Sequence, residues 1–199
     1  MEKAFTEIYK KNKWGNGSGS GSNMTIDNQK YIELLESILN EYNIQTICDI
    51  GCGDWQFSQF INWGNREYTG IDCVKSVIDA NKKQFDDNNI KFIHKSLDSN
   101  YTPKGFDLII LKDVIQHWED KDILSFLQPI IDNNKYVFLT NGYKFMRDPS
   151  KNNLTKRCIK NQYRYHPVDI DKYPLNEIKS SCLLKKERRA KQMLLLQKI

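Results

Sequence analysis

The chain has 199 residues, of which 39% are hydrophobic and 28% are charged, and its formal net charge is +5. This balance is typical of an ordinary globular protein with its own core and excludes an intrinsically disordered chain. The mild positive charge does not predict a dedicated nucleic-acid-binding protein. No apolar run is long enough to cross a bilayer, and residues 1–7 lack the apolar stretch of a signal peptide. We therefore expect a cytoplasmic protein, in the host cytoplasm if the source is a virus, with no membrane partner.

The cysteines and histidines do not form a recognisable metal-binding or disulfide pattern. The five cysteines are odd in number and widely spread, and no Cys-x-x-Cys pair occurs among them. The three histidines are too scattered for a zinc site, and the carboxylates are too dispersed for a divalent cation. The sequence therefore predicts no metal.

The N-terminal part combines a Gly/Ser segment with a helix. After Trp14, residues 15–22 are mainly glycine and serine, a composition that on its own favours a flexible linker. Ile32, Leu35 and Leu39 then recur at helical spacing. This spacing predicts a helix that begins after a cap at Thr25 or Asp27.

Strands and helices alternate through the middle of the chain. Five apolar segments are typical of buried strands: residues 46–50, 68–71, 90–93, 106–111 and 136–140. Helices are expected through Phe57, Phe60 and Ile61, over residues 74–85 and over residues 123–131. The alternation predicts an α/β fold with a parallel sheet and helices on both faces.

The C-terminal part is less regular. Residues 142–174 show no clear periodicity, and a loop of this length in a compact domain is more often functional than idle. Residues 178–184 and 193–196 fit a closing pair of strands, whereas the Lys-, Glu- and Arg-rich stretch favours a helix over residues 183–197. Propensity alone leaves both alternatives open.

A glycine turn follows the first strand and is bracketed by acids. Gly51 and Gly53 allow a ligand to approach the backbone closely, as in any nucleotide site of such a sheet. A dinucleotide site, however, has a third glycine where Gln56 stands and keeps the turn uncharged. Asp49 and Asp54 would repel a pyrophosphate but suit the ammonium and sulfonium groups of S-adenosylmethionine.

A further acid follows the second strand. Asp72 lies about twenty residues beyond the turn, where a carboxylate can accept both hydroxyls of a ribose. The alternative is a tight turn with ordinary surface acids. The combination of Asp49, the two glycines and Asp72 favours the cofactor site.

Three segments carry a resemblance to a known family. Residues 47–54, Ile-Cys-Asp-Ile-Gly-Cys-Gly-Asp, resemble the first motif of class I S-adenosylmethionine-dependent methyltransferases, and residues 68–72 resemble their second. Residues 112–118 are similar to a stretch that follows the fourth strand in many of them. The resemblance implies a Rossmann-like, seven-stranded, mostly parallel sheet with an antiparallel C-terminal strand, and so favours strands at the C-terminus. It also implies S-adenosylmethionine as cofactor, with S-adenosylhomocysteine as product.

The outer segments resemble a small bacterial and viral-type subset with sugar-linked roles. That subset has a Trp-Gly pair followed by a Ser/Gly-rich stretch, as in residues 8–22. The resemblance implies an N-terminal segment, residues 1–24, whose Gly/Ser loop covers the cofactor, and a methyltransferase domain over residues 25–199. It adds Trp14 and Ser18 to the cofactor residues. Lys112, on the rim after the fourth strand, is the last predicted cofactor residue. Where the family often has an acid for the adenine, this chain has only Ser96, and Asp98 follows two residues further on.

Candidate catalytic and acceptor residues lie beyond the fourth strand. His117 is the best general base, because histidine titrates close to neutral pH, but it equally suits a structural role. Asp113 orients the acceptor or the base, or only holds the turn. The acceptor wall is predicted from the long irregular segment: Tyr143, Arg147, Tyr163, Arg164 and His166.

The leading functional hypothesis is O-methylation of a small molecule or a sugar, such as a nucleotide-sugar or glycan hydroxyl. An RNA or tRNA methyltransferase, with nucleic acid as its partner, is the second hypothesis. It ranks lower because no separate RNA-binding module is evident in the sequence. A non-catalytic cofactor-binding subunit of a partner protein is the third hypothesis. The sequence makes no prediction of the oligomeric state.

Overall fold

The computed structural model describes residues 2–19, 21–96, 101–144 and 167–199. The chain divides into two compact units, residues 1–96 and 97–199, and each is described by itself. Unit 1 contains the glycine turn and the N-terminal segment. Unit 2 contains the C-terminal strands.

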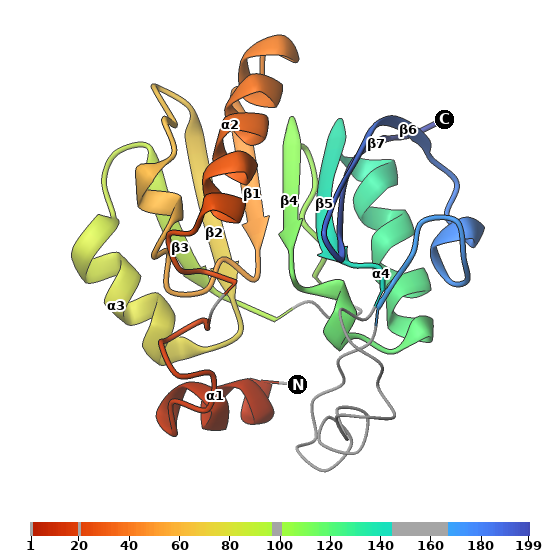
Figure 1. The fold of residues 1–199 in the computed structure, drawn as a ribbon. Helices are drawn as coiled ribbons and strands as arrows, with labels where there is room; N and C mark the ends of the chain where they lie inside the picture. The colour runs from red at the N-terminus through yellow and green to blue at the C-terminus, as the bar shows by residue number, and fades with distance from the viewer. Residues whose placement is uncertain (1, 20, 97–100, 145–166) are drawn as a thin grey trace. The chain divides into compact units, whose positions relative to one another are not determined.

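Unit 1 is a three-stranded parallel sheet with helices. Its elements are α1 (Glu2–Lys10), α2 (Ile26–Glu41), β1 (Thr46–Ile50), β2 (Glu67–Asp72), α3 (Lys75–Phe85) and β3 (Ile90–His94). The strands lie in the order β3-β2-β1, and α3 lies beside β2 and β3 (Figure 1). As predicted, α2 begins after Thr25, whose hydroxyl accepts the backbone N–H of Asn28 at 3.3 Å.

The expected helix through Phe57, Phe60 and Ile61 is wrong. Over residues 51–66, all of them described, the only helical element is a single 3-10 turn, Ser58–Phe60. Trp55 has a φ of 58°, a left-handed conformation that a helix cannot contain. Its indole is 4% exposed and packs against the rings of Trp63, Tyr68 and Phe92. Burial of this aromatic cluster therefore outweighs local helix propensity.

Unit 2 is a four-stranded mixed sheet with one long helix. Its elements are β4 (Leu108–Lys112), α4 (Asp120–Asn133), β5 (Tyr136–Gly142), β6 (Ser181–Arg188) and β7 (Lys191–Gln197). The strand order is β4-β5-β7-β6, parallel between β4 and β5 and antiparallel on both sides of β7. Residues 137–139 and 194–196 are completely buried, as expected for central strands.

The C-terminal alternatives are resolved in favour of strands. The apolar run of β7 pairs with the buried strand β5, and the burial that results outweighs the helix propensity of the charged stretch. That stretch forms most of β6 at the edge of the unit, where its lysines and Glu187 are exposed.

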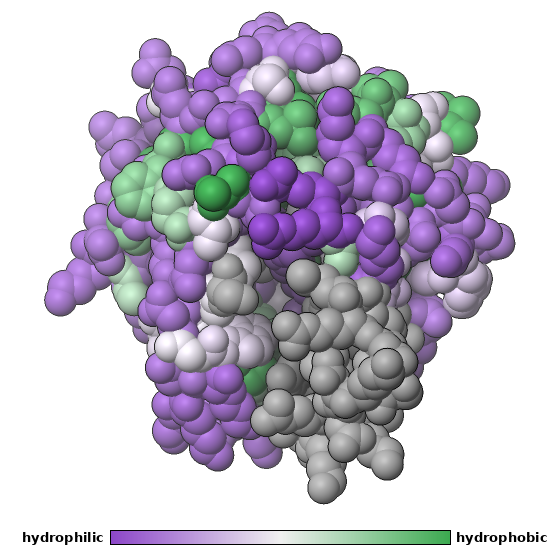
Figure 2. Space-filling view, viewed as in Figure 1, coloured by the Kyte–Doolittle hydropathy of each residue, from purple (hydrophilic) through white to green (hydrophobic). Residues whose placement is uncertain are grey.

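Most of the face in Figure 2 is hydrophilic. None of the described helices is both long and apolar enough to span a membrane. Within the described ranges, no group of three or more His, Cys, Asp and Glu side chains is placed to hold a metal ion.

Candidate functional site

The glycine turn begins where β1 ends. Gly51 and Gly53 have φ values of 75° and 59°, which favour glycine. The backbone N–H groups of Gly51 and Cys52 donate to the carbonyl of Ile71 at 2.7 and 3.1 Å, so the turn is held against the end of β2. Gly51 is exposed and Gly53 is buried. Only the first of the two glycines therefore presents open backbone to a ligand.

Asp72 joins the turn to the start of α3. Its carboxylate accepts the backbone N–H of Gly53 at 3.1 Å and that of Val74 at 2.8 Å. The side chain is 9% exposed, and burial raises the pKa of its carboxyl above the ordinary value. Asp72 thus has a structural role in the turn in addition to any role toward a ribose.

Asp49 lies at the end of a buried hydrogen-bond chain. The indole N–H of Trp55 donates to the Tyr68 hydroxyl at 2.9 Å, and that hydroxyl donates to Asp49 Oδ2 at 2.7 Å. Burial raises the pKa of Tyr68 well above its usual value, so the hydroxyl remains a donor. Asp49 itself is 7% exposed. The aromatic cluster therefore fixes the Asp49 carboxylate, just before the turn.

Residues 16–18 form a strap that lies directly on the turn. The Ser18 backbone N–H donates to Asp54 Oδ2, and the Asp54 backbone N–H donates to Ser18 Oγ, both at 2.9 Å. The Tyr9 hydroxyl lies 2.5 Å from the same Oγ. A Cβ at Gly53 would lie 2.4 Å from Ser18 Oγ. Gly53 is therefore required for the approach of the strap.

Two predicted residues of unit 1 remain, Trp14 and Ser96. Trp14 packs on α1, with ring centroids 5.9 Å from Phe5 and 5.8 Å from Tyr9. It therefore helps to fix the start of the strap. Ser96 is half-buried beyond the end of β3.

Unit 2 brings two of the predicted residues together with one that was not predicted. Lys112 Nζ lies 3.2 Å from Asp113 Oδ2, and the ammonium of Lys191 forms an ion pair with the same oxygen. Asp113 has a φ of 62°, and its backbone N–H donates to the Thr140 carbonyl at 2.7 Å. A non-glycine residue held in this region is strained, and such strain is common at functional sites.

We expect Asp113→Asn to lower the free energy of unfolding by about 2 kcal/mol at pH 7. Burial alone would raise the pKa of Asp113, but Lys112 and Lys191 outweigh it and lower the pKa to about 2 from an ordinary 3.8. The stabilisation is therefore present above pH 4 and is lost as the pH falls toward 2. Urea titrations of both proteins over this range should show the difference shrinking.

The exposed ion pair between Asp171 and Lys185, 2.7 Å apart, supplies the control. Asp171→Asn should change the stability little at any pH, because exposed pairs contribute about 0–1 kcal/mol. A loss of stability in Asp113→Asn that persists unchanged at pH 2 would contradict the ion-pair explanation.

Only part of the predicted acceptor wall can be placed. His117 is half-buried in a 3-10 helix, Ile115–His117, and its backbone N–H donates to the Val114 carbonyl at 3.0 Å. The Tyr143 hydroxyl donates to Glu187 at 2.8 Å. Four predicted residues of the wall lie outside the described residues: Arg147, Tyr163, Arg164 and His166.

Three residues of these arrangements are absent from the sequence predictions. Tyr9 and Tyr68 contact predicted residues through their hydroxyls, and Lys191 does so through its ammonium. Tyr68 carries a detectable signal, since a hydroxyl in an otherwise apolar buried strand requires a partner. Lys191 carries none, because 78 residues separate it from Asp113.

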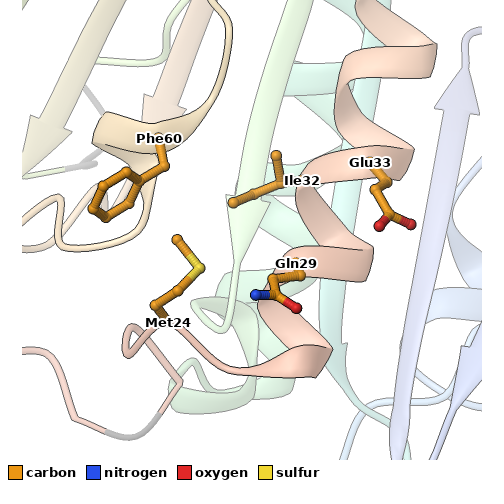
Figure 3. Close-up of a pocket in the computed structure, with 5 residues that line it drawn as sticks. All are labelled: Met24, Gln29, Ile32, Glu33 and Phe60. Atoms are coloured by element: carbon orange, nitrogen blue, oxygen red, sulfur yellow. The ribbon is translucent and has the colours of Figure 1, made fainter.

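A shallow hollow of about 430 Å³ lies elsewhere on unit 1. Figure 3 shows the side chains of Met24 and Ile32 directed toward Phe60, and Gln29 and Glu33 of α2 also line the hollow. None of the predicted site residues is among these five. The hollow is therefore separate from the set of residues around the turn.

The chain is similar in sequence to known methyltransferases. Residues 47–134 match a family model described as a methyltransferase domain. The Schizosaccharomyces pombe mitochondrial ubiquinone biosynthesis O-methyltransferase is 24% identical over 146 residues, 68% of this chain and 53% of that protein. The ubiquinone biosynthesis O-methyltransferase of Rickettsia bellii is 29% identical over 91 residues, 45% of this chain and 38% of that protein. The chain thus spans about half, or less, of the length of these curated relatives.

Solved structures show the fold. Magnesium protoporphyrin IX methyltransferase from Synechocystis PCC 6803, with bound SAH, has a TM-score of 0.61 and 14% identity, and the match covers 85% of this chain and 83% of that one. The methyltransferase domain of a bacterial Hen1 has a TM-score of 0.63 and 17% identity, over 86% and 98% of the two chains. The predicted mostly parallel sheet with antiparallel C-terminal strands is confirmed. This chain therefore has the Rossmann-like fold of class I methyltransferases, and its residues 47–134 match a methyltransferase domain.

Proposed function

We propose that the chain is an S-adenosylmethionine-dependent methyltransferase that methylates an oxygen atom of a small molecule. One observation carries the proposal. Asp54 Oδ1 is buried and has no hydrogen-bond partner among the described residues, although Oδ2 of the same carboxylate accepts two donors. A buried carboxylate oxygen without a donor is costly, and a cationic ligand at the turn would supply the donor.

The residues of unit 1 fit this cofactor. Asp54 offers its unpartnered oxygen to the ammonium group of the methionine part, and the exposed Gly51 leaves the backbone open to the ligand. Asp72 accepts the ribose hydroxyls, and Ser96 lies on the adenine side. Ser18 and Trp14 hold the strap over the turn. When bound, S-adenosylmethionine supplies a methyl group that is already activated by the sulfonium.

The residues of unit 2 serve the acceptor. His117 removes the hydroxyl proton, because the low pKa of Asp113 makes that carboxylate a poor base near neutral pH. Asp113 instead orients the hydroxyl, and Tyr143 belongs to the acceptor wall. The curated relatives are named O-methyltransferases, which supports oxygen as the methylated atom. A sugar hydroxyl, such as that of a nucleotide-sugar, is the acceptor class that we propose.

Calorimetry with S-adenosylmethionine tests the proposal directly. We expect saturable binding to the wild type, and we expect Asp72→Ala to weaken it tenfold or more, which corresponds to about 1.4 kcal/mol. Asp79→Ala is the matched control, since Asp79 is an exposed acid of α3 paired with Lys75 at 2.7 Å. Wild-type protein that does not bind the cofactor would overturn the proposed function.

A further inference from the structure

The ends of three strands in unit 2 place polar side chains on one face. Lys112 is in register with Thr140, which is in register with Met193, and Gly142 is in register with Lys191. Paired residues of neighbouring strands point to the same face, and so do residues two apart within one strand. Lys112, Thr140 and Lys191 therefore share a face at the ends of β4 and β5 and the start of β7.

The ammonium of Lys191 reaches from β7 across β5 to Asp113, which follows β4. The position of β5 between them is occupied by Gly142, which has no side chain. Two ammonium groups thus meet one carboxylate oxygen, and the cluster keeps one positive charge in excess.

This excess charge is only partly solvated. The side chain of Lys112 is 11% exposed and that of Asp113 is 20% exposed, whereas Lys191 is 41% exposed and accessible to a ligand. A partly buried net charge is unfavourable until a counter-charge pairs with it. The cluster therefore suits an anion that approaches from the side of Lys191.

Two buried oxygens in the same cluster lack a partner. Asp113 Oδ1 and Thr140 Oγ1 make no hydrogen bond to any described residue, and Thr140 is 2% exposed. A carboxylate oxygen accepts only, and a threonine hydroxyl both accepts and donates. A ligand that satisfies both oxygens carries a hydroxyl close to its anionic group.

We propose that Lys191 binds an anionic group, a carboxylate or a phosphate, on the methyl acceptor, while Asp113 and Thr140 bind a hydroxyl of the same molecule. That the anion belongs to the methyl acceptor rests on the proposed function; the anion site itself does not. Lys191 is in this proposal an acceptor-binding residue, and it acts by positioning rather than by proton transfer.

The test uses the full chain with inorganic phosphate and acetate as separate probes. Backbone amide signals of Gly142 and Lys191 are followed by NMR as each anion is added. We expect at least one anion to shift these signals in the wild type, and we expect Lys191→Gln to weaken that binding tenfold or more. Lys191→Arg should retain binding, because it keeps the charge. The stronger of the two probes identifies the acceptor group as phosphate or carboxylate.

Lys186→Gln is the matched control, since Lys186 is an exposed lysine of the same hairpin, in register with Met193. Equal binding by Lys191→Gln and the wild type, an equal loss in Lys186→Gln, or no shift with either anion in the wild type would overturn the proposal. Cofactor affinity is measured in the same proteins and should not change in Lys191→Gln. A wild type that binds the anion but no S-adenosylmethionine would overturn the proposed function alone.

Discussion

Tyr68→Phe should lower the free energy of unfolding by about 2 kcal/mol or more, although it removes a single oxygen atom. The Tyr68 hydroxyl receives the indole N–H of Trp55 and donates to the carboxylate of Asp49. Its removal takes an acceptor from one buried group and a donor from another. Water cannot replace it easily, because Tyr68 is 1% exposed and Trp55 is 4% exposed.

Loss of the Tyr68 hydroxyl should also disturb the glycine turn. Asp49 is the penultimate residue of β1, and Gly51 follows that strand directly. We therefore expect Tyr68→Phe to weaken the binding of S-adenosylmethionine as well as the fold, measured by calorimetry and by urea unfolding. Tyr173→Phe is the control, because Tyr173 is 59% exposed. Similar stabilities for the two variants would show that the buried chain contributes little.

The strands of this chain are predictable because their apolar composition indicates that they are buried. Strands covered on both faces are rich in apolar residues, as residues 46–50 and 136–140 are, and short runs of this kind favour a strand. Segments with mixed signals depend on partners instead. Residues 54–63 contain enough apolar residues for a helix, but the packing of Trp55 against distant aromatic rings decides their conformation.

The residues of the candidate site also divide into those that local motifs predict and those that depend on distant partners. Local motifs identify Gly51, Gly53 and Asp72, because the turn chemistry is contained within about twenty residues. The partners that complete the site come from elsewhere in the chain: Ser18 pairs with Asp54 across 36 residues, and Lys191 pairs with Asp113 across 78. Strand register and strap docking decide these pairs, and neither is encoded in a short pattern.

A substitution in the strap, residues 16–18, is expected to have the second large effect, on cofactor binding. Gly17→Ala should weaken cofactor binding tenfold or more, about 1.4 kcal/mol, and should release residues 16–18 from the turn. A Cβ at Gly17 would lie 1.8 Å from Asp54 Oδ2. That oxygen accepts the Ser18 N–H at 2.9 Å and the Gln56 side chain at 2.6 Å. The overlap is relieved if Asp54 turns away or if the strap leaves the turn, and in either case the hydrogen bond between Ser18 and Asp54 is lost.

Gly15→Ala separates this overlap from backbone strain. Gly15 has a φ of +89°, so alanine is strained there too, but its Cβ would meet nothing within 4 Å. Left-handed strain costs roughly 1–2 kcal/mol per residue in either variant. Calorimetry with S-adenosylmethionine and limited proteolysis before residue 24 should therefore distinguish them, with weaker binding and faster cleavage only in Gly17→Ala. Equal behaviour of the two variants would mean that strain, and not the contact between strap and Asp54, controls the turn.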